Sequence, residues 1–256
     1  MIKRILLSTA IAITVLGLCG GYFYHVSRIE RSGRDSLICR NIEISVRDSA
    51  INRIITASQI RSVIGDGFLG MAVNSIDLNE VETRIDSLGE VLFSRVYPTS
   101  NSMIIEVMPR TAAVRFITDG GQHYYSDATG FLFPVESSVN TPVVTGKIPL
   151  RTGKNFKGYS IDPQERQWLK GILRFTSYIE SNSYWKEMTS HVNIDEKGEI
   201  ELYPLKGNVK FQFGKPEDLT EKFAKMELWY KAIAPTPKAA SYSSVNLKYD
   251  NQIICR

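Results

Sequence analysis

The stretch LFSRVYPTSNSMIIEV, residues 92–107, decides the fold of the first folded part of the chain. Two segments rich in aromatic and β-branched residues predict strands at Leu92–Tyr97 and Met103–Val107, because short segments of this kind bounded by turn residues are typical of strands. The segment Pro-Thr-Ser-Asn at residues 98–101 favours a turn between them. We therefore expect a pair of strands here, and the preceding residues indicate what packs against it.

Toward the N-terminus, the sequence predicts one more strand and two helices. Ile42–Val46 alternates apolar and polar residues, which is the pattern of a half-buried strand. Thr56-x-x-Gln59 is a capping box at the start of one helix, and Asp77-x-x-Glu80 begins the next in the same manner. Each helix has an apolar face, formed by Ile60, Val63 and Ile64 in the first and by Leu78, Val81, Ile85 and Leu88 in the second. The predicted order is β-α-α-β-β.

The N-terminus combines a basic tip with a long uncharged run. Ile5–Tyr24 is long enough to cross a hydrocarbon core, which needs about 20 mostly apolar residues. We predict a tip at residues 1–4, a membrane-spanning helix at Ile5–Val26 and a linker at residues 27–36. A cleaved signal peptide and a lipoprotein signal are the alternatives, but no small-x-small site follows the run and Leu18 precedes Cys19. Basic residues flank both sides of the run, so charge alone does not decide its orientation.

From about Pro109 the pattern changes to short strands separated by turns. Asp127–Gly130 favours a type I turn that ends in a left-handed glycine. Helices are predicted from Asp162 and from Pro216, and a final strand at Ser244–Tyr249 continues toward Cys255. The expected fold class is α+β, with an N-terminal transmembrane helix, a β-α-α-β-β module at residues 37–109 and a β-rich domain with flanking helices at residues 110–256.

Composition and motifs argue against several classes of function. The net charge of +4 comes from scattered basic residues, which is not the footprint of a nucleic-acid-binding protein. The three histidines lie in separate segments, and no metal-binding, nucleotide-binding or nucleophile motif appears, so we expect no cofactor, no metal and no catalytic residue. Cys39 and Cys255 can pair in an oxidising compartment, but spacing alone does not show that they do.

Five segments of the chain are similar, in this order, to motifs of one known family. They are TASQI at residues 56–60, FSRVYP with MIIEV at 93–107, QHYYSDATGFLF at 122–133, PVVTG at 142–146 and VNLKY at 245–249. With the preceding anchor, they resemble the FtsQ/DivIB family of bacterial cell-division proteins. Ala112 and Asn246 depart from the pattern, which usually has Pro and Asp at these places.

The resemblance implies a non-enzymatic, bitopic inner-membrane protein of the division septum, with its N-terminus in the cytoplasm and the bulk of the chain in the periplasm. Residues 37–109 would be a POTRA module that contacts other divisome proteins. The last strand would dock FtsB and FtsL, and an exposed strand edge can do so by pairing with a partner strand. The partner-binding residues expected on this basis are Tyr242, Val245, Asn246, Leu247, Lys248 and Tyr249.

Three other interpretations are open at this stage. The last strand can simply complete the sheet, with side chains that only fill the core. A POTRA-containing protein of outer-membrane assembly would need a membrane barrel after the module, and the remaining sequence has few strands of the required length. An anchored periplasmic enzyme would need a nucleophile or a metal site, which the sequence does not offer.

Overall fold

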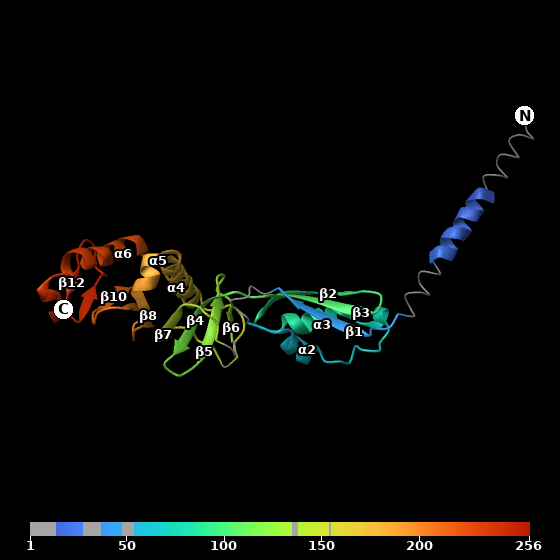
Figure 1. Ribbon diagram of the computed structural model, residues 1–256, viewed down its shortest axis with the longest axis horizontal. Coiled ribbons are helices and arrows are strands. Elements are labelled where there is room, and N and C mark those ends of the chain that lie inside the picture. Colours follow the sequence, from blue (N-terminus) through green and yellow to red (C-terminus); the bar gives the residue numbers. More distant parts are fainter. Residues whose placement is uncertain (1–13, 28–36, 48–53, 135–137, 154) are drawn as a thin grey trace, which may run out of the picture. The chain divides into compact units, whose positions relative to one another are not determined.

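The computed structural model describes residues 14–27, 37–47, 54–134, 138–153 and 155–256. The chain forms two compact units, of which the first takes in residues up to Arg47, Thr56–Ser87 and Phe93–Met108. The second takes in Ile54, Ile55, Leu88–Leu92 and Pro109–Arg256. Each unit combines helices with a sheet, so the predicted α+β class is confirmed (Figure 1).

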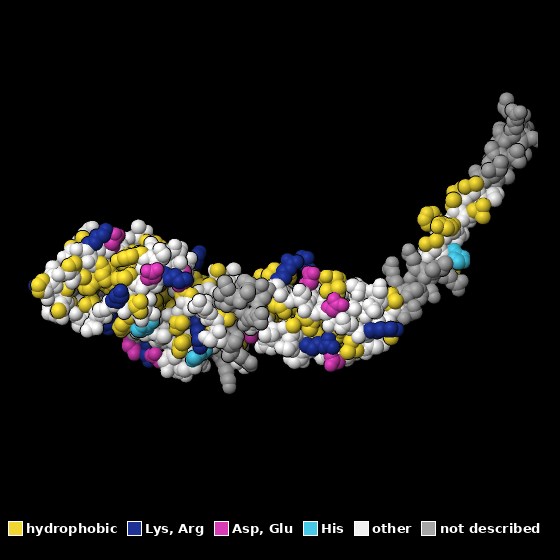
Figure 2. All heavy atoms as spheres, in the orientation of Figure 1, with side chains coloured by type: hydrophobic (Ala, Val, Ile, Leu, Met, Phe, Trp, Pro, Cys, Tyr) yellow, Lys and Arg dark blue, Asp and Glu magenta, His cyan; other side chains and the backbone are white. Residues whose placement is uncertain are grey.

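Residues 14–27 are helical and expose large apolar side chains such as Leu16 and Phe23 (Figure 2). Within the described ranges, no helix has both the length and the apolar character that crossing a membrane requires. The expected span begins at Ile5, so its first part lies outside the described residues, as do the tip at 1–4 and most of the linker at 27–36. The membrane-spanning helix therefore stays a prediction.

The first unit has the element order expected from its sequence, with one short addition. Its sheet has the order β1-β3-β2, in which β1 and β3 run parallel. The elements are β1 (Asn41–Val46), α2 (Ala57–Ile64), the 3-10 helix η1 (Val73–Ser75), α3 (Leu78–Asp86), β2 (Val91–Pro98) and β3 (Ser102–Pro109). Thr56 forms the predicted capping box with Gln59, and Asp77 accepts a hydrogen bond from the Glu80 N–H at 3.1 Å.

Four residues of the predicted apolar faces belong to the core of this unit, whereas Leu78 and Leu88 are half-buried and Val63 is 38% exposed. Ile60 and Ile64 of α2 and Val81 and Ile85 of α3 are buried. The sheet contributes buried residues from alternate positions, namely Ile42, Met103, Ile105 and Val107. Every second side chain of the strands and every third or fourth side chain of the helices therefore pack together in one core.

The second unit is built on a nine-stranded sheet. Its order among the described residues is β12-β11-β10-β9-β8-β7-β4-β5-β6. The strands are β4 (Ala112–Thr118), β5 (His123–Asp127), β6 (Leu132–Phe133), β7 (Val143–Gly146), β8 (Thr189–Ile194), β9 (Ile200–Pro204), β10 (Lys210–Gly214), β11 (Ser244–Asn246) and β12 (Ile254–Cys255). The strands at the two ends of the sheet, β6 and β12, are each two residues long.

Helices supply the apolar partners of this sheet. The helical elements are α4 (Pro163–Ser181), α5 (Ser183–Met188), α6 (Leu219–Leu228), the π-helix η2 (Trp229–Ile233) and the 3-10 helix η3 (Pro237–Ser241). Asp162 caps α4 through the Gln164 N–H at 2.7 Å, and Pro163 occupies its first turn, as the sequence predicts. Phe175 and Phe223 stack in the core beside Phe213 of β10.

A nearly buried ion pair fixes the turn between β5 and β6. The Arg110 guanidinium lies 2.8 Å from an Asp127 carboxylate oxygen and 3.6 Å from the centre of the Phe131 ring. The other oxygen of Asp127 accepts hydrogen bonds from the backbone N–H groups of Thr129 and Phe131. Gly130 has the positive φ, 90°, that the turn sequence predicts. The backbone of Gly158 pairs with Leu132, so β6 is covered on its outer side.

We predict that Asp127→Asn lowers the free energy of unfolding of the second unit by about 3 kcal/mol, because the change leaves the Arg110 charge buried without its counterion. Tryptophan fluorescence during urea unfolding measures this unit alone, since Trp168, Trp185 and Trp229 all belong to it. Asp119→Asn is the control. Asp119 pairs with Lys147 at 3.5 Å while both side chains are half exposed, so a loss below about 1 kcal/mol is expected. Equal losses in the two variants would contradict the prediction.

A second prediction concerns Gly146, at the end of β7. Its φ is 100°, and a Cβ there would lie 2.3 Å from the Ile194 carbonyl oxygen of β8. Gly207 has a similar φ of 97°, with no atom of the described residues near its missing Cβ. Both alanine variants incur the backbone strain, of about 1–2 kcal/mol. Gly146→Ala must also separate two paired strands, so we expect it to lose at least about 1 kcal/mol more than Gly207→Ala in the same urea experiment.

Candidate docking surface at the end of the sheet

The end of the chain forms two short strands rather than one. β11 pairs with β10 in parallel, and the chain then turns at Asn251, whose φ is 56°, and returns as β12 antiparallel to β11. The prediction of a single edge strand from Ser244 to Tyr249 that continues to Cys255 is therefore wrong. Its physical reason is the Asp250-Asn251 pair, because Asp and Asn favour turns and Asn tolerates the left-handed conformation.

Two of the six expected partner-binding residues belong to the core. Val245 and Leu247 are fully buried, among the residues that pack against the helices. They share one face of the strand, as the alternation predicts. The Leu247 N–H also donates to the Gln212 carbonyl oxygen at 3.1 Å, so this residue is tied to β10 by its backbone as well. Both side chains are covered in this structure, which leaves them a supporting role at most.

The other four expected residues lie at or near the surface. Tyr249 is 51% exposed, whereas Tyr242, Asn246 and Lys248 are half-buried. The Lys248 ammonium pairs with a Glu199 carboxylate oxygen at 2.9 Å, and this hydrogen bond raises the pKa of Lys248 above its ordinary value. Gly214 leaves room for the Lys248 stem, because a Cβ there would lie 2.7 Å from it. A role of these four residues in binding stays a prediction.

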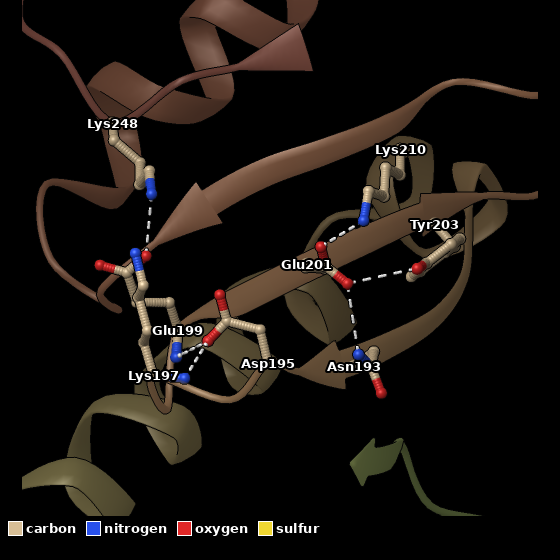
Figure 3. A network of polar contacts seen from close by, with 8 residues as sticks. All are labelled: Asn193, Asp195, Lys197, Glu199, Glu201, Tyr203, Lys210 and Lys248. Carbon is tan, nitrogen blue, oxygen red and sulfur yellow. Dashed lines mark hydrogen bonds and ion pairs between the residues drawn. The ribbon is translucent and has the colours of Figure 1, made fainter. Parts of the chain in front are cut away.

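A polar network lies beside Lys248 on the strands β8, β9 and β10 (Figure 3). The Glu201 carboxylate contacts the Lys210 ammonium at 2.5 Å, the Tyr203 hydroxyl at 3.2 Å and the Asn193 amide at 3.3 Å. The hydrogen bond between Lys210 and Glu201 raises the pKa of Lys210, and partial burial raises the pKa of Tyr203. The contacts with Lys210 of β10 and Asn193 of β8 join side chains of neighbouring strands, whereas Tyr203 lies on β9 itself, and all of them are on the face opposite the buried Leu202 and Phe211. They hold this part of the sheet in register.

Two buried lysines of α6 hold the segments around β11 in place. Lys225 donates to the Tyr249 carbonyl oxygen at 2.8 Å and pairs with Glu221 at 2.7 Å. Lys222 donates to the Lys215 carbonyl oxygen at 2.8 Å, and burial lowers its pKa. Lys215 follows β10 and Tyr249 follows β11, so both contacts fix the chain at the same end of this parallel pair, where the turn to β12 begins.

β12 presents the outer edge of the sheet. Ser244 and Arg256 exchange two backbone hydrogen bonds, of 3.0 and 2.9 Å. Opposite residues in antiparallel strands alternate between bonded and non-bonded pairs, so the next pair, Val245 with Cys255, directs the Cys255 N–H and C=O away from β11. Among the described residues, no strand pairs with this outer side. Apolar side chains gather at this end of the unit (Figure 2).

The sequence interpretation missed β12, although a signal was present. Asp250-Asn251 is a turn signal, and the apolar pair Ile253-Ile254 follows it. Cys255 is a free thiol whose pKa is raised by burial, and Cys39 is a free buried thiol. Within the described ranges, no three His, Cys, Asp or Glu side chains gather as a metal site. The chemistry that this surface offers is that of a strand edge.

The comparison with known proteins agrees with the fold of the second unit. Residues 112–256 match the family model described as FtsQ/DivIB, C-terminal related, and this range covers every strand of the nine-stranded sheet. The search of curated proteins gives no match. Because the match extends over more than half of the chain, this protein belongs to the FtsQ/DivIB C-terminal related family, which places it among the cell-division proteins.

Proposed function

We propose that this chain is a bitopic inner-membrane scaffold of the bacterial division septum, which links early and late divisome proteins by protein–protein contacts and has no catalytic activity. Membership of a cell-division family supports the process. The single observation that supports docking as the mode of action is the outer edge of β12, with which no strand of the described residues pairs. An edge of this kind offers backbone N–H and C=O groups to a strand of a partner.

In this proposal, residues 1–4 lie in the cytoplasm, Ile5–Val26 cross the membrane and residues 27–36 link the span to the periplasmic units. Residues 37–109 act as a POTRA module with further divisome contacts. Residues 110–256 carry the docking edge for FtsB and FtsL. The apolar run of the N-terminal sequence supports this topology.

In the proposed docking edge, the backbone supplies the hydrogen bonds and the side chains select the partner. The Cys255 N–H and C=O supply the hydrogen bonds to the incoming strand, and Ile253, at the next alternate position, supplies further ones. Lys248 and Tyr249 lie at the turn that leads to β12, so their side chains set which partner fits. The Lys248 ammonium is already paired with the Glu199 carboxylate, so an acidic group of a partner must compete with Glu199 for it.

We predict that Cys255→Pro weakens binding of the FtsB–FtsL complex about tenfold, because proline removes the outward N–H and puts a ring in its place. The bonds between β11 and β12 are kept, since proline is tolerated where the N–H of an edge strand faces outward. Titration of the purified full chain with FtsB–FtsL measures the loss, and a melting temperature within about 3 °C of the wild type shows that the fold is kept.

Cys255→Ala is the matched control, because it removes the thiol and keeps the backbone. It should bind FtsB–FtsL as the wild type does. A folded Cys255→Pro variant with unchanged affinity would exclude strand pairing at β12, and the edge would then only complete the sheet.

A further inference from the structure

The outer face of α4 carries a row of basic side chains. Arg166, Lys170 and Arg174 are all exposed and stand four residues apart, which separates neighbours by about 6 Å along the helix axis. They line one side of a groove with a volume of about 1040 Å³. Thr129 and Tyr159 belong to the other lining residues, and they are hydrogen-bonded to each other through their hydroxyl groups at 3.1 Å.

The positive charge of this groove is largely uncompensated. Within the described part of the chain, Lys170 and Arg174 make no ion pair and no hydrogen bond. The one acidic residue among the lining residues described is Glu180, and its carboxylate is paired with Lys186 at 2.7 Å. Arg166 donates from Nη1 to the carbonyl oxygens of Ser160 and Ile161, at 2.8 and 2.6 Å, which holds its guanidinium in place.

We propose that this groove binds an extended acidic segment of a partner protein. In an extended chain, alternate side chains point to the same side and lie about 7 Å apart, close to the spacing of the three basic residues. Five residues with carboxylates at the first, third and fifth positions therefore meet the whole row. A helical segment of the same reach would have only about two turns, which is too short to be stable before binding.

The shape of the site favours a peptide over a membrane. A bilayer surface is flat and would reach only the outermost charges of α4, whereas a single extended chain can enter a groove. The lining residues come from α4, from Ala113 of β4 and from the segments at 128–130 and 159, and none belongs to β10, β11 or β12. This second binding surface is thus independent of the proposed docking edge.

The test uses the purified full chain and a labelled peptide of alternating Glu and Thr, with a peptide of alternating Gln and Thr as its uncharged counterpart. Fluorescence anisotropy should show binding of the Glu peptide only, and the affinity should fall as salt is added. The double variant Lys170→Gln/Arg174→Gln should bind about tenfold more weakly, because two of the three charges are gone. Glutamine is a good helix former, so α4 should be kept.

Lys206→Gln/Lys238→Gln is the matched control, since it removes the same charge from two other exposed positions. It should bind the Glu peptide within about twofold of the wild type. If both double variants bind the Glu peptide equally more weakly than the wild type, the proposal is overturned, because binding then depends on the net charge of the protein and not on the groove. Binding to phosphatidylglycerol vesicles without binding of the Glu peptide would also overturn it, in favour of a membrane surface. The α4 variant should bind FtsB–FtsL normally, which separates this result from a failure of the docking edge.

Discussion

The burial of one face of the nine-stranded sheet against the helices, from β4 to β11, is the constraint on which the second unit depends. Alternate side chains of its strands must lie under the helices, and the buried members run across the sheet from Phe116 through Val144, Val192, Leu202 and Phe211 to Val245. A shift of one residue in any pair would move polar side chains into this interior. The charged side chains of Glu201 and Lys210, which form an ion pair on the outer face, would then be buried in the core. The register of each strand is therefore strongly determined.

Local signals in the sequence were sufficient for most elements. The Thr56 and Asp162 caps, the apolar faces of the helices and the turn at Asp127–Gly130 each depend on residues a few positions apart, and each is present in the structure. The short length of β11 could not be predicted in this way. The alternation of Val245, Leu247 and Tyr249 extends past the point where the pairing with β10 ends, so the pattern favours a longer strand than the structure has before the turn at Asn251.

The candidate site was harder to predict, because an edge is a property of the whole pairing order. Val245 and Leu247 are core residues because their side chains face the helices, and β12 takes the outer edge of the sheet from β11. The buried Lys222 and Lys225 could not be foreseen either. Their partners are backbone carbonyl groups of Lys215 and Tyr249, and no side-chain pattern records where a distant carbonyl group will lie. The basic row of α4 is visible in the sequence, but its groove is formed by turns from other parts of the chain.

The two-residue length of β6 and β12 has a consequence for solubility. Long exposed edges invite pairing between copies of a chain, and short edge strands are one of the ways in which proteins avoid aggregation. β6 is in addition covered by Gly158, and β12 offers few backbone groups beyond those of Cys255. Such an edge holds a foreign strand weakly unless side chains outside the ladder also fit. A wide sheet can thus remain monodisperse while one of its ends stays open to a selected partner.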